Sequence, residues 1–178
     1  MTEKIKLYDD SKCTACRGCQ LACKQWNALT ASQTENRGTY QNPPSLAPNT
    51  FLLIHYQDYV DKDGNVKWLF RKEACMHCTN AACVTVCPSG ALHYNKETKT
   101  VGLDHEKCIG CKECVAACPF EIPRWDAKTD KVYKCDMCES RITNGMDPAC
   151  VKACPTGALS WGPKDKMLKA AAKRVEQL

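Results

Sequence analysis

The sequence predicts an α+β protein made of short strands, long loops and a C-terminal helix, arranged as two similar halves. Three observations support this prediction. One cysteine motif recurs four times along the 178 residues, short apolar runs bounded by turn residues separate the repeats, and Pro163 to Leu178 has helical spacing. Because the chain has only three Phe residues, we expect something other than side chains to occupy part of the interior.

The sixteen cysteines all belong to the repeats, and none is left over. Three closely spaced thiolates on a tight loop suit three iron corners of a 4Fe–4S cubane. The fourth cysteine of each motif follows after three residues, where we expect a helix to begin, and serves the neighbouring cluster, as in two-cluster ferredoxins. Motifs one to four are Cys13-x2-Cys16-x2-Cys19-x3-Cys23, Cys75-x2-Cys78-x4-Cys83-x3-Cys87-Pro88, Cys108-x2-Cys111-x2-Cys114-x3-Cys118-Pro119 and Cys135-x2-Cys138-x11-Cys150-x3-Cys154-Pro155.

We therefore predict four 4Fe–4S clusters in two ferredoxin-like domains, each holding two clusters, with no catalytic residue in the chain. The outer domain is predicted from residues 1–69 with 126–162, the inner domain from 70–125, and a C-terminal helix from 163–178. If each fourth cysteine crosses to the partner motif, the iron ligands form four sets: Cys13, Cys16, Cys19 and Cys154; Cys23, Cys135, Cys138 and Cys150; Cys75, Cys78, Cys83 and Cys118; Cys87, Cys108, Cys111 and Cys114.

Disulfides and zinc are the alternatives for so many cysteines. A disulfide framework is typical of exported proteins, but Met1 to Asp10 is polar and has no secretory signal. Structural zinc sites usually combine two separated C-x2-C pairs, whereas here three cysteines come close together and a Cys-Pro step follows in three motifs. The spacing therefore favours clusters over zinc.

The formal net charge of +5 does not indicate a nucleic-acid partner. Cluster-bound cysteines are thiolates, so a fully loaded protein has a net charge of about −3. No block of five or six like charges occurs. No run of apolar residues is long enough to span a membrane, so we expect no transmembrane segment in this sequence.

The segments between the motifs predict short strands and turns. Two further short strands are expected at 91–94 and 100–103, and an extended, proline-rich surface loop at 36–49. A hairpin is predicted from Thr50–Val60 and Val66–Phe70, joined at Asp63-Gly64. In the C-terminal helix, Leu168, Ala171, Val175 and Leu178 fall on one face, with lysines opposite, and we expect the helix to dock on the protein or on a partner. The four tryptophans are expected in the core.

Catalytic motifs are missing, since the sequence contains no G-x-G-x-x-G, P-loop or H-E-x-x-H pattern. Cysteines that bind iron cannot act as nucleophiles. His77 lies inside motif two and is a candidate for tuning or shielding a cluster. Basic residues beside the ligands either raise cluster potentials or are ordinary solvated charges; they are Arg17, Lys24, Lys107, Lys112 and Lys134.

Nearly the whole sequence resembles the iron–sulfur (beta) subunits of formate dehydrogenases. The stretches that carry the resemblance are Cys13 to Asn27, Gly38 to Pro43, Trp68 to Cys78, Cys118 to Arg124, Val132 to Cys135 and Pro148 to Ala158. The four-cluster arrangement is shared by many subunits that partner molybdenum or tungsten enzymes of the dimethyl sulfoxide reductase superfamily. The Gln-Trp-Asn and Tyr-Gln-Asn-Pro elements are more typical of formate dehydrogenase.

The resemblance implies an electron-transfer subunit beside a large molybdopterin-type catalytic subunit, with a cytochrome b or another subunit as acceptor. Two alternatives stay open: the same role beside a polysulfide, nitrite or aldehyde enzyme, and a free-standing polyferredoxin. Membrane-bound family members continue into a transmembrane helix that has no counterpart here, so we expect a soluble or peripheral complex. Because such subunits can be exported with a catalytic subunit that carries the signal, the compartment stays open between cytoplasm and periplasm.

Overall fold

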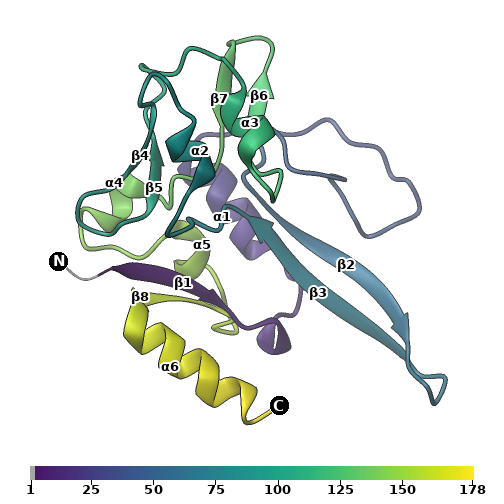
Figure 1. Ribbon diagram of the computed structural model, residues 1–178. Coiled ribbons are helices and arrows are strands. Elements are labelled where there is room, and N and C mark those ends of the chain that lie inside the picture. The colour runs from purple at the N-terminus through teal and green to yellow at the C-terminus, as the bar shows by residue number, and fades with distance from the viewer. Residues whose placement is uncertain (1–2) are drawn as a thin grey trace.

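The computed structural model describes residues 3–178 and has the α+β architecture that the sequence predicts (Figure 1). Its strands form four separate two-stranded antiparallel sheets, β1–β8, β2–β3, β4–β5 and β6–β7. In chain order the elements are β1 (Lys4–Tyr8), the 3-10 turn η1 (Asp10–Lys12), α1 (Gly18–Trp26), β2 (Leu52–Val60), β3 (Val66–Ala74), α2 (Ala82–Thr85), β4 (Leu92–Tyr94), β5 (Val101–Leu103), α3 (Glu113–Ala117), β6 (Arg124–Asp126), β7 (Lys131–Tyr133), α4 (Glu139–Ile142), α5 (Ala149–Lys152), β8 (Leu159–Pro163) and α6 (Lys164–Val175).

The two ends of the sequence meet in the sheet formed by β1 and β8. Lys4 lies opposite Pro163 and Tyr8 lies opposite Leu159. Helices α1 and α5 pack against each other beside this sheet. Motif one, which follows β1, is therefore brought next to motif four, which precedes β8.

The β2–β3 hairpin forms as predicted but is longer, because β3 continues to Ala74. A five-residue loop closes it: the Asp61 carboxylate accepts the N–H groups of Asp63 and Asn65 at 3.0 and 2.9 Å, and Gly64 has a φ of +81°. The base of the hairpin is buried, with Leu53 fully inaccessible. The tip extends away from the rest of the molecule (Figure 1).

Each half of the molecule has its own apolar core. One gathers Phe51, Leu52 and Ile54 from the base of β2 around cysteines of motifs one and four. The other gathers Leu92, Val101 and other residues of the small hairpins around cysteines of motifs two and three. The strands at 92–94 and 101–103 agree with the prediction. Cysteines are thus a main component of both cores, which explains how so few large apolar side chains suffice.

Helix α6 lies where the sequence predicts it, but the predicted apolar face is wrong. Met167 is the buried residue, whereas Leu168 is 52% exposed, Val175 73% and Leu178 74%. Ion pairs at both ends of the helix set this face, because Lys164 binds Glu3 at 2.9 Å and Arg174 binds Asp9 at 3.1 Å. Pro163 precedes the helix as its N-cap and does not form the first turn.

The tryptophans are not core residues, contrary to the expectation. Trp26 is 43% and Trp68 49% exposed, and the other two are half-buried. Cations cover two of them, with the Arg141 guanidinium 4.4 Å from the Trp26 ring and the Lys112 ammonium 3.4 Å from the Trp125 ring. The indoles lie on the outside because cysteines fill the interior.

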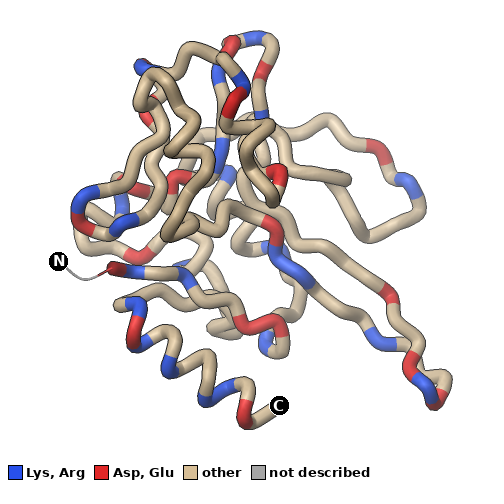
Figure 2. Tube along the Cα trace, viewed as in Figure 1, with Lys and Arg blue, Asp and Glu red and all other residues tan. Residues whose placement is uncertain are grey.

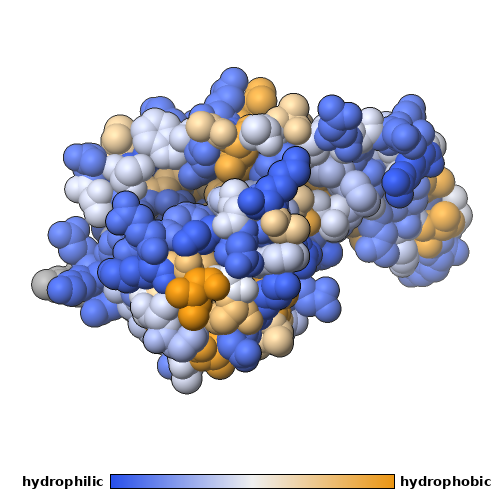
Figure 3. All heavy atoms as spheres, turned by 90° about the horizontal axis from the view of Figure 1, so that it is seen from above, coloured by the Kyte–Doolittle hydropathy of each residue, from blue (hydrophilic) through white to orange (hydrophobic). Residues whose placement is uncertain are grey.

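The predicted surface loop at 36–49 is largely exposed, and Leu46 fixes it by its burial in a small apolar cluster with Leu53 and Ile122. Basic and acidic residues are interspersed along the chain (Figure 2). Seen from above, apolar side chains form small patches separated by hydrophilic ones (Figure 3). Among residues 3–178 no helix is both long and apolar enough to cross a membrane.

Candidate metal centres

The sixteen thiols are all free. We sort them into four groups, named A to D, that follow the ligand sets expected from the sequence, and compare each group with its surroundings in the structure. Group A is Cys13, Cys16, Cys19 and Cys154; group B is Cys23, Cys135, Cys138 and Cys150; group C is Cys75, Cys78, Cys83 and Cys118; group D is Cys87, Cys108, Cys111 and Cys114.

Group A surrounds a small cavity beside the β1–β8 sheet. Its four cysteines line this cavity together with apolar side chains that include Ile54 and Leu159. Group B is the most enclosed, since each of its cysteines is 5–8% exposed. Burial raises the pKa of Cys23, and the charges of the other three group B thiols raise it further.

Groups C and D show the same mutual proximity. Burial raises the pKa of Cys83, and the three other cysteines of group C add to the rise. In group D, burial and the neighbouring thiols raise the pKa of Cys114 to about 11. Crowded thiols resist ionisation because each thiolate repels the next. Such an array becomes fully ionised only around a positively charged core.

Neighbouring groups share an apolar core. Cys19 of group A, Cys150 of group B and Cys75 of group C pack in or against one core. Cys83 of group C and Cys114 of group D pack in or against the other. The four groups therefore form a continuous series through the interior.

Each motif loop turns through a left-handed residue at its third position. These residues are Ala15, His77, Gly110 and Met137, with φ between 49° and 70°. The turn brings backbone N–H groups towards sulfur: Ala15 donates to Cys13 Sγ at 3.4 Å and Met137 to Cys135 Sγ at 3.4 Å. Hydrogen bonds of this kind stabilise thiolates.

The expected helix is present in each motif but begins earlier than predicted. The third cysteine already lies in a helix, namely Cys19 in α1, Cys83 in α2, Cys114 in α3 and Cys150 in α5. In motifs two to four the fourth cysteine follows the end of that helix. The short helix therefore separates the third and fourth thiols and directs them to different groups.

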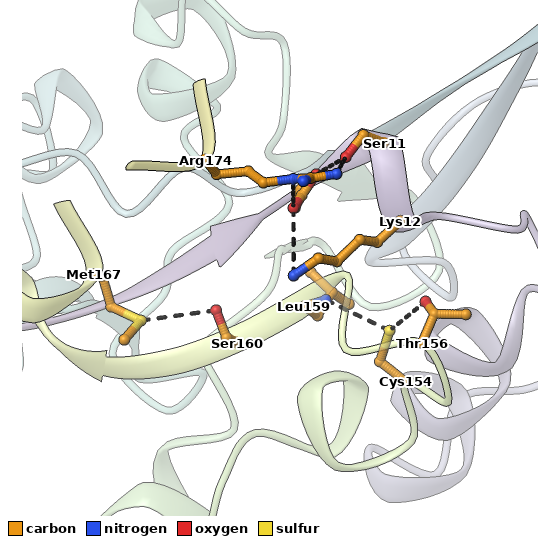
Figure 4. A network of polar contacts seen from close by, with 9 residues as sticks. Ser11, Lys12, Cys154, Thr156, Leu159, Ser160, Met167 and Arg174 are labelled. Atoms are coloured by element: carbon orange, nitrogen blue, oxygen red, sulfur yellow. Dashed lines mark hydrogen bonds and ion pairs between the residues drawn. The ribbon is translucent and has the colours of Figure 1, made fainter. Parts of the chain in front are cut away.

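Cys87 and Cys154 have matching surroundings because the sequence repeats Cys-Pro-Ser/Thr-Gly-Ala-Leu after both motifs. The Leu92 N–H lies 3.5 Å from Cys87 Sγ and the Leu159 N–H 3.4 Å from Cys154 Sγ. A hydroxyl lies beside each sulfur, as Figure 4 shows for Thr156 at 3.8 Å. Burial by itself would raise the pKa of both thiols, but these hydrogen bonds outweigh burial and lower it. This repeat was a signal available in the sequence.

Most of the basic residues proposed beside the ligands are engaged elsewhere. Lys24 donates to the Asn49 carbonyl at 2.6 Å, Lys107 pairs with Asp104 at 3.0 Å, Arg17 lies over the Tyr56 ring and Lys112 over Trp125. Of the five, Lys134 alone is buried, at 3% exposure. Sequence reasoning missed Lys6 and Lys72, which also reach the interior, because no motif spacing points to them.

The donor set fits iron–sulfur clusters. All sixteen donors are thiols, backbone N–H groups face several of the sulfurs, and apolar residues exclude water around them. Within the part of the sequence that the structure describes, no three His, Cys, Asp or Glu side chains converge closely enough to hold one bare metal ion. The thiols are spread more widely than in a single-ion site.

Comparison with known families identifies the kind of domain. Two family models, each described as a 4Fe-4S dicluster domain, match overlapping ranges, one at residues 66–164 and the other at 12–91. Two dicluster domains and sixteen cysteines account for four 4Fe–4S clusters. These matches agree with the cofactor that the sequence predicts.

Several curated proteins resemble the chain over nearly its full length. The formate dehydrogenase 2 subunit beta (cytochrome c-553) of Nitratidesulfovibrio vulgaris is 44% identical, over 97% of this chain and 82% of the relative. The nitrate-inducible formate dehydrogenase iron-sulfur subunit of Escherichia coli is 40% identical, over 99% of this chain. A component of the anaerobic dimethyl sulfoxide reductase of Haemophilus influenzae is 36% identical, over 90% of this chain and 74% of the relative.

The chain spans about 60% of the length of the Escherichia coli relative. Within that part the dicluster motifs and the identity of 38–44% to several formate dehydrogenase subunits point the same way. The chain therefore belongs to the family of formate dehydrogenase iron–sulfur (beta) subunits.

Proposed function

We propose that this chain is the electron-transfer subunit of a formate dehydrogenase, carrying electrons from a molybdopterin-type catalytic subunit to an acceptor. Each 4Fe–4S cluster supplies a site that takes up and releases one electron. The observation that supports the proposal best is the continuous series of thiol groups A to D, in which the thiols of each group lie close enough for their charges to act on the next group.

We further propose that groups A to D are the ligand sets of the four clusters. Every group combines three cysteines of one motif with the fourth cysteine of another. On this assignment residues 1–69 with 126–162 form the outer domain around A and B, residues 70–125 form the inner domain around C and D, and residues 163–178 are the terminal helix. Groups A and B draw on both ends of the sequence, which the β1–β8 sheet holds together.

The ends of the series are the places where electrons enter and leave. Two of the sixteen thiols are exposed, Cys16 in group A and Cys111 in group D. All thiols of group B are buried. A partner that docks over Cys16 and another that docks over Cys111 can exchange electrons with the series, whereas a partner cannot reach group B directly.

Formate is the proposed substrate of the partner because relatives that are 40% and 44% identical are named formate dehydrogenase subunits. A second candidate is the same role beside another oxidoreductase, and the similarity to a component of a dimethyl sulfoxide reductase supports it. A free-standing polyferredoxin is a third candidate.

Anaerobic purification of the native complex distinguishes these candidates. We expect about sixteen iron atoms and a similar amount of sulfide per chain, a large partner that co-purifies, and reduction of the clusters by formate, followed by electron paramagnetic resonance. Reduction of the clusters by an aldehyde, or reoxidation of dithionite-reduced clusters by polysulfide or nitrite, without any reduction by formate, would identify another oxidoreductase. A monomer on gel filtration would favour the free-standing carrier, and a colourless zinc protein would contradict the proposal altogether.

A further inference from the structure

Three lysines lie where groups B and C meet: Lys134, which follows β7 and is buried, and the half-buried Lys6 of β1 and Lys72 of β3. We name them the lysine junction. We propose that the lysine junction raises the reduction potentials of the two middle clusters, those of groups B and C. The inference rests on the proposed ligand sets and adds to them the residues that set the energy of an electron halfway along the series.

Lys6 serves group B. Its ammonium lies 3.9 Å from Cys150 Sγ and is in position to donate to it. Burial acts to lower the pKa of Lys6, but the charges of Cys135, Cys150 and Cys23 outweigh burial and raise it, with Cys75 of group C contributing least. The Lys6 ammonium is thus placed directly against the sulfur of a group B ligand.

Lys134 serves group C. Its side chain is 3% exposed, and its ammonium donates to the carbonyls of Val101 at 2.6 Å and Cys135 at 2.8 Å. These two hydrogen bonds hold the ammonium between Val101 in β5 and Cys135, the first cysteine of motif four. The Val101 N–H in turn donates to Nδ1 of His77, which lies between Cys75 and Cys78 in the sequence, so the ammonium also lies beside group C.

Lys72 completes the junction. It lines one cavity of about 280 Å³ together with Lys6, Cys75 and His77. Burial and the Lys6 charge lower the pKa of Lys72 to about 8. In the same cavity wall, His77 Nδ1 accepts the Val101 N–H at 3.0 Å, so Nε2 of the neutral ring carries the proton. That Nε2 is buried and has no hydrogen-bond partner among the described residues.

No carboxylate of residues 3–178 forms an ion pair with the junction. The ion pairs that these residues make join Lys12, Lys67, Lys107, Lys164, Arg174 and His55 to acidic side chains, and none of them includes Lys6, Lys72 or Lys134. An ammonium group buried without a counter-charge is strongly unfavourable. The thiolates of groups B and C are the negative charges that remain nearby to compensate it.

This arrangement acts on the electron because reduction adds one negative charge to a cluster that four thiolates already make anionic. In a low-dielectric interior, fixed positive charges lower the free energy of that extra charge more than they would in water. The junction therefore favours an electron on the middle clusters. It lies at the boundary between the two halves, where group B meets group C.

The test is a redox titration of the holo-complex, followed by electron paramagnetic resonance, with Lys6→Met and Lys134→Met. We expect two of the four midpoint potentials to fall and the other two to stay, with Lys6→Met acting mainly on one middle cluster and Lys134→Met on the other. Lys6→Arg keeps the charge and is expected to restore the potential. Lys62→Met, at the exposed tip of the hairpin, is the matched control and should change none of the four.

Iron content separates this inference from the proposed function. A wild-type protein without four clusters would overturn the proposed ligand sets, whatever the lysines do. A fully loaded Lys6→Met complex with four unchanged potentials would overturn the lysine junction alone. Should Lys6→Met lose iron, Lys72→Gln carries the test, because Lys72 donates to no sulfur of the described residues; unchanged potentials in that loaded variant would equally contradict the inference.

Discussion

At the scale of single residues, the third position of each motif decides how the loop folds. Its residue is left-handed in all four motifs, yet Gly stands there in motif three only. A Cβ at Gly110 would lie 2.3 Å from the Asp130 carbonyl oxygen, so no other residue fits. At Ala15 the same conformation is adopted by a residue with a Cβ, which costs on the order of 1 kcal/mol.

Gly110→Ala is therefore expected to damage group D selectively. The left-handed backbone together with the contact at Asp130 should cost roughly 2 kcal/mol or more, and the loop can avoid this only by moving Cys108 and Cys111. We expect a loss of about four iron atoms per chain, measured by iron analysis after anaerobic purification. Ala15→Gly is the matched control, since it relaxes the backbone and should keep all clusters. Equal iron in both variants would contradict the argument.

The residues that the sequence identified and those that it missed differ in how far apart their partners lie. The cysteines were found because each motif repeats within a short stretch, and Lys134 was found because Cys135 follows it directly. Lys6 reaches Cys150, which lies 144 positions away. Nothing local in the sequence marks such a contact, so only the folded protein reveals the junction.

At the scale of elements, the distance between partners along the sequence also explains which strands were predicted. The hairpin at 52–74 and the strands at 92–94 and 101–103 pair with near neighbours and were predicted from turn residues between apolar runs. Strands β1 and β8 were not predicted, because each has five residues and its partner lies at the opposite end of the sequence. The strands of the β6–β7 hairpin are as short as β4 and β5, but their sequences, Arg-Trp-Asp and Lys-Val-Tyr, are mainly polar or charged at their ends. No apolar run therefore marked this hairpin in the sequence.

Helix α6 shows that ion pairs can override an apolar stripe. Met167→Ala is expected to destabilise the protein by about 2 kcal/mol because it removes the buried anchor of the helix on β1 and β8. Leu168→Ala, which changes an exposed neighbour, should cost less than about 0.5 kcal/mol. The measurement is the guanidinium concentration at which cluster colour is lost. A larger loss of stability in Leu168→Ala than in Met167→Ala would show that the helix packs through the apolar face that the sequence predicted.

At the scale of the whole molecule, two of the cluster sites depend on the meeting of the two ends of the sequence. Cys154 lines the group A cavity with three cysteines of motif one. We expect Cys154→Ala to remove the signal of that cluster and about four iron atoms, while the cluster that takes three ligands from motif four remains. Cys87→Ala is the matched variant and should instead remove the cluster of group D. Loss of only the motif-four cluster in Cys154→Ala would contradict the crossed assignment.

The order of the groups makes a stronger prediction about electron flow. Because cysteines of groups A, B and C pack in or against one apolar core and we propose that B is the middle group, the Cys138→Ala variant should interrupt the series without blocking either exposed end. With formate as donor, we expect reduction either of cluster A alone or of clusters C and D alone, depending on which end contacts the catalytic subunit. Dithionite, which reaches both ends, should still reduce all three remaining clusters. Rapid reduction by formate on both sides of the missing cluster would show that the series is branched and would rule out a single path through the protein.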